Sequence, residues 1–193
     1  METLRGRYAV IGWGSLIWDL EILSPHVSPP WSHGLGPALP IEFSRVSPKR
    51  RMALVAVIDP EHGAPCATHV VASVRASLAE AALDLGARER APESAIGGLC
   101  VDTGFRRSRH PEVEDAVAAW CARAGARGAV WTDLPRNFAE TVGKPFSLEA
   151  AEAYLLELTG EAAAEARRYM REAPAETDTP LRRRMRDRGW LDR

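Results

Sequence analysis

The chain has 193 residues, 46% hydrophobic and 26% charged, an ordinary globular composition that can supply one good core. Its 25 basic and 26 acidic residues nearly cancel, which argues against a general attraction to nucleic acid or to a membrane surface. Three cysteines, sparse and odd in number, argue against a disulfide framework. The excess of Ala, and of Arg over Lys, is typical of a GC-rich bacterial genome.

The N-terminal residues do not resemble a targeting segment. Residues 1–7 are charged, and glycine interrupts the apolar run that follows, unlike the run in a secretory signal peptide. No apolar stretch reaches the length of a transmembrane helix. We therefore expect a cytoplasmic protein with a single domain, residues 1–193, in which residues 147–193 form a helical C-terminal extension.

The first half of the chain carries mostly strand signals. The apolar run at residues 8–11 predicts a buried strand that stops at the glycines around Trp13. Prolines concentrated in residues 24–40 predict a long connection, a kind of segment that is often functional in compact domains. Further strands are expected at residues 40–46, 52–58, 67–74, 96–101 and 129–132.

Helix signals dominate the second half. Ser77, followed three residues later by Glu80, forms a capping-box pattern that predicts a helix over residues 78–85. Gly86 is placed to end this helix, because glycine favours the left-handed backbone found just after helices. Further helices are expected at residues 111–124, from Ser147 to Gly160, at 161–172, and from Asp178 or Thr179 to residue 188. This order favours an α+β fold, with helices packed against a small mixed barrel or curled sheet.

The segment after the first expected strand has the most informative pattern. Gly12 and Gly14 flank Trp13 and precede Ser15, so the backbone can turn sharply and approach a ligand closely. Successive N–H groups in such a turn can bind a carboxylate or a phosphate. The simpler interpretation is a strand that ends in a glycine turn.

Residues 12–16 also resemble the strand–loop signature of the γ-glutamylcyclotransferase superfamily, including its ChaC-like and AIG2-like branches. That signature usually reads Tyr-Gly-Ser-Leu or Tyr-Gly-Thr-Leu. Here Gly14, Ser15 and Leu16 match it, and Trp13 stands where the family usually has Tyr.

A second segment strengthens this resemblance. Family members carry a Leu-Asp-x-x-Glu or Leu-Asp-x-Arg-Glu segment just after a helix, and Leu85, Arg88 and Glu89 match its last form. Gly86 replaces the usual Asp, and residues 90–92 replace the glycines and tyrosine that often follow. The order of the segments fits as well. The resemblance covers roughly residues 8–135 and implies a cyclotransferase-like small mixed β-barrel with packed helices, followed by the helical C-terminal region.

The resemblance also implies an activity. In this reaction the substrate's own α-amine attacks its γ-carbonyl, closes a 5-oxoproline ring and expels an amine, an amino acid or a peptide. Glu89 would be the acid–base residue. Trp13, Gly14, Ser15 and Leu16 would bind the glutamyl head group. No metal and no organic cofactor is required, and glutathione, γ-glutamyl dipeptides and γ-glutamyl-amines all remain possible substrates.

The surroundings of Glu89 matter for this role. We expect Glu89 to lie on an extended segment, where its neighbours Arg88 and Arg90 point away from it into solvent. Glu93 is the reserve candidate for the acid–base role. A solvated loop residue is the simpler interpretation of either glutamate.

Two other functions are consistent with the sequence. A non-catalytic protein could bind a small anionic metabolite through the same glycine loop. Alternatively, the Arg-rich residues 181–193 could contact nucleic acid or another protein, although a solvated helix face is the better explanation, because acidic residues nearby offset much of the charge. A metal site at His62, Cys66 and His69 is disfavoured, since Cys66 and His69 would point to opposite faces of one strand.

Overall fold

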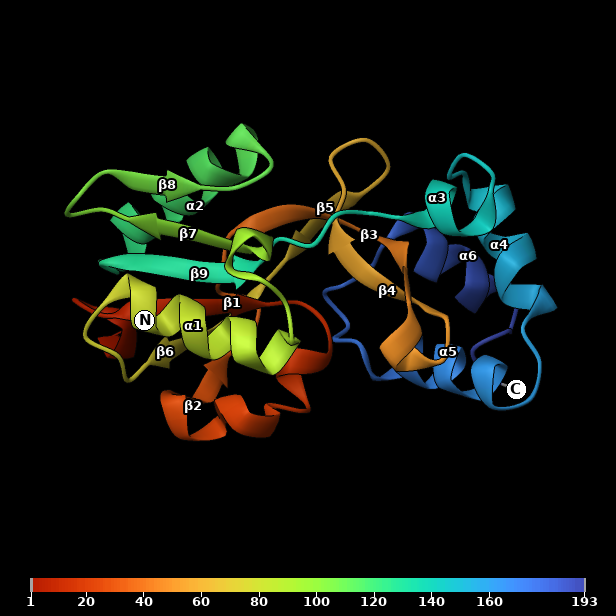
Figure 1. The fold of residues 1–193 in the computed structure, drawn as a ribbon, viewed down its shortest axis with the longest axis horizontal. Helices are drawn as coiled ribbons and strands as arrows, with labels where there is room; N and C mark the ends of the chain where they lie inside the picture. The colour runs from red at the N-terminus through yellow and green to blue at the C-terminus, as the bar shows by residue number, and fades with distance from the viewer. Residues whose placement is uncertain (1, 193) are drawn as a thin grey trace. The chain divides into compact units, whose positions relative to one another are not determined.

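Residues 2–192 are described by a computed structural model, which has an α+β fold with a six-stranded sheet and a three-stranded sheet (Figure 1). The α+β class expected from the sequence is therefore confirmed. The chain divides into two compact units, one formed by residues up to 39 together with 67–134, the other by 40–66 together with residues from 135 onward. The single-domain organisation stays a prediction.

The first unit contains the six-stranded sheet. Its strands, in spatial order, are β2 (Val27–Ser32), β6 (His69–Ser73), β1 (Tyr8–Gly12), β9 (Gly128–Thr132), β7 (Ile96–Cys100) and β8 (Phe105–Arg107). β1 runs parallel to β9 and antiparallel to β6, so the sheet is mixed. Among the described strands, β2 and β8 are open edges, and the expected closed barrel is not formed.

The reason for this difference is the position of three strands in the second unit. β3 (Ala38–Ser47), β4 (Ala53–Ile58) and β5 (Ala64–Ala67) form a sheet of their own, with β3 in the middle. The strands expected at residues 40–46 and 52–58 are therefore present, but they extend a different sheet from the one that contains β1.

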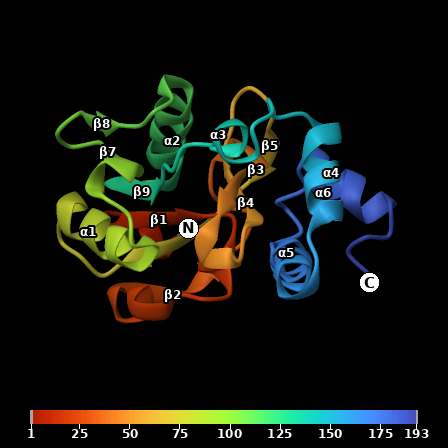
Figure 2. The same ribbon diagram turned by 45° about the vertical axis from the view of Figure 1, so that its right-hand side comes forward.

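Strand β1 lies inside its sheet, and all five of its residues are buried. Val10 faces helix α1 (Leu78–Glu89) together with the neighbouring strand residues Val71 and Val130. Helix α2 (Pro111–Ala124), which has the extent expected from the sequence, packs on the opposite face (Figures 1 and 2). The sheet is thus covered on both sides, which explains why β1 is apolar without alternation.

The proline-rich segment is more regular than expected. Instead of one long connection, residues 21–32 form a short 3₁₀ helix, η3 (Glu21–His26), followed by strand β2. Pro29 and Pro30 lie within β2, which pairs only with β6 among the described strands. Proline is tolerated there because an edge strand needs ladder hydrogen bonds on one side only.

Helix α1 begins as expected but ends later. The Ser77 hydroxyl accepts from the Glu80 N–H at 3.2 Å, which confirms Ser77 as the N-cap, and it donates to Glu80 Oε2 at 2.7 Å. The helix then continues through Gly86 to Glu89. Arg90, at φ 52° and ψ 44°, takes the left-handed position that the sequence had suggested for Gly86. A glycine that is compatible with a helix end is equally compatible with a tightly packed helix interior.

The second unit carries the remaining α-helices: α3 (Phe138–Val142), α4 (Leu148–Glu157), α5 (Gly160–Glu172) and α6 (Pro180–Asp187). Ser147 caps α4, and of the two candidates before α6 it is Thr179 that caps, by accepting from the Arg182 N–H. Helix α4 ends at Glu157 rather than at Gly160, which instead starts α5.

Short 3₁₀ helices complete the fold: η1 (Glu2–Leu4), η2 (Ser15–Ile17), η4 (Pro48–Arg50) and η5 (Glu93–Ala95). Within the described part of the chain, every helix is too short or too polar to cross a lipid bilayer.

Candidate functional site

The loop after β1 folds back on the end of its own strand. Gly14 precedes the turn η2, and the Ile17 N–H donates to the Gly14 carbonyl at 3.0 Å. The Asp19 N–H then donates to the Ser15 carbonyl at 2.9 Å. Leu16 is buried in the core beneath α1, whereas Ser15 is half-buried. The apolar Leu16 therefore fixes the turn and leaves the Ser15 side chain at its rim.

Gly12 is required by close packing rather than by an unusual backbone angle. A Cβ atom at this position would lie 3.1 Å from Ile17 Cδ1 and 3.2 Å from Trp31 Cη2. Both distances are shorter than ordinary van der Waals contacts, so a larger residue would push the turn away from the strand. The first glycine of the sequence pattern thus determines how closely the loop approaches β1.

The C-terminal turn of α1 supplies the charged side chains of the site. Glu89 is the last residue of the helix and its side chain is 16% exposed. Arg88 is more deeply buried, with a side chain that is only 5% exposed. The expectation of an extended segment with both arginines in solvent is therefore wrong for Arg88. The extended backbone is not found either, because Glu89 is helical and Arg90 is in the left-handed conformation. Only the exposure of Arg90 agrees with the expectation: its side chain is 69% exposed and pairs with Glu21.

The guanidinium of Arg88 joins this turn of α1 to the loop after β1. Arg88 Nη1 donates to Glu89 Oε1 at 2.9 Å. Arg88 Nη2 donates to the Asp19 carbonyl at 2.6 Å and, at a longer 3.4 Å, to Ser15 Oγ. Arg88 Nε is buried and has no hydrogen-bond partner among the described residues. We refer to these three contacts, to Glu89, Asp19 and Ser15, as the Arg88 bridge.

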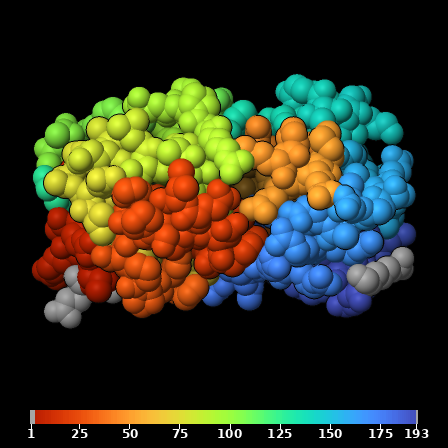
Figure 3. Space-filling view, turned by 60° about the horizontal axis from the view of Figure 1, so that its bottom comes forward, coloured from red at the N-terminus to blue at the C-terminus, as the bar shows by residue number. Residues whose placement is uncertain are grey.

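The structure therefore brings together Ser15 and Glu89 from the two segments singled out in the sequence. Trp13 and Leu16 contribute mainly buried apolar surface, and Gly14 starts the turn. In Figure 3 the chain following this loop, in orange-red, lies at the surface beside α1, in yellow to yellow-green.

Glu93, the reserve candidate, lies outside this arrangement. It begins η5, and its side chain is 64% exposed. Arg107 Nη1 donates to Glu93 Oε1 at 2.6 Å. An exposed ion pair of this kind on the surface leaves the carboxylate in water.

The burial of Arg88 and its contacts with the loop were not expected from the sequence, although a signal for the burial was present. Residues 81, 85 and 88 recur at the i, i+4, i+7 spacing of a buried helix face, and Ala81 and Leu85 are indeed core residues. Extending the helix beyond Gly86 would have placed Arg88 on that face. A helix that ends at Gly86 does not include residue 88, so the i, i+4, i+7 spacing is not recognised.

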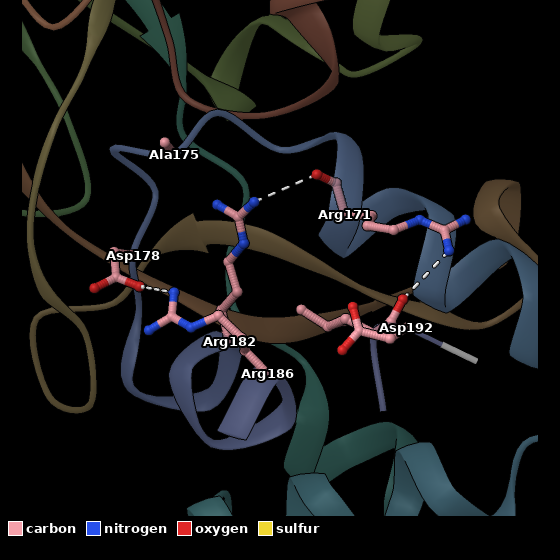
Figure 4. A pocket seen from close by; sticks show the side chains of 7 residues that line it. Arg171, Ala175, Asp178, Arg182, Arg186 and Asp192 are labelled. Carbon is pink, nitrogen blue, oxygen red and sulfur yellow. Dashed lines mark hydrogen bonds and ion pairs between the residues drawn. The ribbon is translucent and has the colours of Figure 1, made fainter. Parts of the chain in front are cut away.

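A cavity of about 480 Å³ lies in the second unit at the Arg-rich end of the chain (Figure 4). Its arginines are occupied by partners within the unit. Arg182 donates to the carbonyls of Ala173 and Thr177, and Arg171 donates to that of Leu191. Burial removes the Arg182 guanidinium from water and lowers its pKa.

The other arginines of α6, and Arg188 just after it, are also paired. Arg184 and Arg188 both contact the carboxylate of Glu152 on α4, while Arg183 and Arg186 contact Asp178. Much of the positive charge of residues 181–193 is thus neutralised by ion pairs that hold α6 in place within its own unit.

Comparisons of the chain with protein-family models, with curated proteins and with solved structures found no match.

Proposed function

We propose that this chain is a γ-glutamylcyclotransferase-like enzyme that converts a γ-glutamyl substrate to 5-oxoproline, and that its first unit carries the cyclotransferase-like fold. The observation that carries the proposal is the Arg88 bridge. It joins the glycine loop to the C-terminal turn of α1, which carries Glu89, although Ser15 and Arg88 lie 73 positions apart in the sequence. These are the same two segments that resemble the family's binding loop and acid–base segment.

In this reaction the nucleophile belongs to the substrate. Glu89 would accept a proton from the α-ammonium group, and the freed amine would attack the γ-carbonyl carbon to close a five-membered ring. The tetrahedral intermediate would then collapse: the bond to the leaving nitrogen would break as Glu89 donates its proton to that nitrogen. The ring nitrogen would lose its second proton to the Glu89 carboxylate thus freed, and this proton would pass on to the released amine or to water. One carboxylate is sufficient because proton removal and proton donation occur in sequence.

The protein's main task is then to hold the substrate in the folded geometry needed for attack. Correct orientation alone can supply about 7–11 kcal/mol in an intramolecular reaction. Main-chain N–H groups of Gly14, Ser15 and Leu16 would bind the α-carboxylate. Because Ser15 Oγ accepts a hydrogen bond from Arg88, its own hydroxyl hydrogen is directed elsewhere and can donate to the substrate.

The test is release of 5-oxoproline from glutathione, a γ-glutamyl dipeptide and a γ-glutamyl-amine. Wild type is compared with Glu89→Gln and with Glu93→Gln, which makes the same chemical change on the exposed carboxylate of η5. We expect turnover in wild type and in Glu93→Gln, and a loss of about a hundredfold or more in Glu89→Gln. Turnover that survives in Glu89→Gln would assign the acid–base role to another residue.

A wild type that is folded but inactive on every substrate would overturn the proposal. Thermal stabilisation by 5-oxoproline or by a γ-glutamyl compound would then favour the metabolite-binding alternative. Salt-dependent binding of nucleic acid that disappears on deletion of residues 181–193 would favour the remaining alternative.

A further inference from the structure

We propose that Arg88 is the positioning residue of this site: it holds the Glu89 carboxylate and the turn at residues 15–19 in one fixed geometry. This inference rests on the proposed function for its kinetic consequence. Its structural part, the dependence of the turn on Arg88, stands independently and is tested separately below.

The directions of the two side chains support this role. Consecutive residues of an α-helix point about 100° apart and do not face each other. Arg88 Nη1 nevertheless lies 2.9 Å from Glu89 Oε1, so the two side chains converge although they leave the helix in different directions. The contacts with Asp19 and Ser15 fix the other side of the guanidinium and keep it in that position.

The guanidinium group has a shape that suits a positioning role. It is planar, and its donors form a rigid fork, so a contact at Nη2 determines the direction in which Nη1 donates. The Asp19 carbonyl at 2.6 Å therefore sets the angle at which Glu89 is held. A flexible ammonium group in the same place would provide charge without this geometric coupling.

Stability alone does not require the Arg88 bridge. A buried ion pair recovers little more than the cost of removing its charges from water, and an apolar pair of similar volume is often as stable. Arg88 Nε, moreover, is a buried donor with no partner among the described residues, which adds a further cost. A guanidinium retained at this cost is consistent with a role in orienting a reactive carboxylate.

The experiment compares wild type with Arg88→Met, Arg88→Lys and Arg90→Met. Methionine keeps the apolar stem and removes the donors, lysine keeps the charge without the fork, and Arg90→Met makes the same change on the exposed arginine two residues further on. Kinetics are measured well below each variant's melting temperature. We expect Arg88→Met to lower kcat about a hundredfold with little change in KM, because a displacement of about 1 Å costs that much.

Arg88→Lys should recover part of the lost kcat, and Arg90→Met should behave as wild type. Equal kcat in Arg88→Met and wild type would overturn the inference while leaving the proposed function intact. So would a rise in KM at unchanged kcat, because that pattern indicates lost binding rather than lost positioning.

A second measurement does not depend on activity. Amide hydrogen exchange of peptides covering residues 15–19 should be about tenfold faster in Arg88→Met than in wild type or Arg90→Met, because the turn loses its bond to α1. Unchanged exchange would overturn the inference whatever the activity. A further outcome is faster exchange in Arg88→Met while wild type shows no turnover on any substrate. That result would support Arg88 as the residue that holds the turn, and it would count against the proposed function alone.

Discussion

Arg90 and Glu21 both have left-handed backbone conformations, with φ of 52° and 46°, and their side chains form an ion pair at 3.5 Å. One residue follows the end of α1, and the other begins η3 just after the glycine loop. Two non-glycine residues with positive φ thus flank the two segments that the Arg88 bridge connects. Such positions are sterically unfavourable for residues with a Cβ atom.

Replacement of Arg90 by glycine should therefore stabilise the protein. Relief of the left-handed strain is worth about 1 kcal/mol, and the exposed ion pair that is lost contributes less. In urea unfolding, we expect the free energy of unfolding of Arg90→Gly to exceed that of Arg90→Ala by about 1 kcal/mol. Alanine is the control because it removes the ion pair but keeps the strain, and equal stability of the two variants would contradict the explanation.

Gly86 provides a test of where α1 ends. Because it lies inside the helix, alanine at this position should raise stability by about 0.5–1 kcal/mol. There is room for the methyl group, since a Cβ would lie 3.4 Å from the Ala91 carbonyl oxygen and 3.6 Å from Ile96 Cγ1. The matched control is Gly125→Ala at the end of α2, where φ is +69° and alanine should cost about 1 kcal/mol. A loss of stability in Gly86→Ala would indicate that the helix ends earlier.

Glu42 should make stability depend on pH. Burial raises its pKa above the usual value of 4.5, against the opposing effect of the Phe43 and Leu181 N–H groups and Thr179. A raised folded-state pKa means that the folded protein holds the proton more tightly than the unfolded chain. This contribution to stability is complete below about pH 4.5 and is lost as the pH rises through the folded-state pKa.

The measurement is the unfolding free energy of wild type minus that of Glu42→Gln, followed from acid to neutral pH. The difference should become less favourable to wild type as the pH rises. Glu149 gives a control of opposite sign, since a hydrogen bond from its own N–H and the contact with Arg184 lower its pKa. Its contribution is lost as the pH falls. A difference for Glu42→Gln that does not vary with pH would contradict the assignment.

The three cysteines should differ in reactivity. Burial raises the pKa of Cys66 to about 11 and that of Cys121 to about 12. At about pH 8, only about one Cys66 thiol in a thousand is then a thiolate. Burial also acts on Cys100, but hydrogen bonds from Thr103 and Tyr8 outweigh it, so the pKa of Cys100 is lowered.

Iodoacetamide should consequently label Cys100 at least about tenfold faster than either of the others, as read by mass spectrometry of digested protein. Labelling in denaturant, where the three thiols should react at similar rates, is the control. Equal labelling of Cys66 and Cys100 in the folded protein would mean that access, and not thiolate content, determines the rates.

Short-range patterns account for most of what the sequence predicts correctly. Three correctly predicted features depend on neighbours within a few positions: the N-cap at Ser77, the helix at residues 111–124 and the buried strand ending at Gly12. Periodicity and capping report such local preferences directly. The α+β class follows from them as well, because it depends on the order of elements and not on their pairing.

Pairing between distant strands could not be obtained in this way. The parallel contact of β1 with β9 joins segments at the two ends of the first unit, and the separate sheet around β3 removes strands that a barrel would need. Periodicity specifies which face of a strand is buried but not which strand lies beside it. The shortest strands, β5 and β8, were missed because three or four residues carry too little pattern.

For the candidate site, too, the sequence predicted the local features but not the geometry. Its residue types were evident from the glycine loop and the segment ending in Glu89. The geometry depended on a single helical turn, since ending α1 at Gly86 places Arg88 in solvent and ending it at Glu89 buries it. Glycine is ambiguous at this point because both helix ends and close-packed helix interiors use it.

The two adjacent prolines of β2 oppose aggregation of the protein through its sheet edges. Strand edges with a complete row of N–H groups are templates on which a second chain can add a strand, which is a common first step of aggregation. Pro29 and Pro30 remove two successive donors from β2, and at the other edge β8 is only three residues long. Neither edge of this sheet offers a long, unbroken ladder, so growth of the sheet from one molecule to the next is obstructed on both sides.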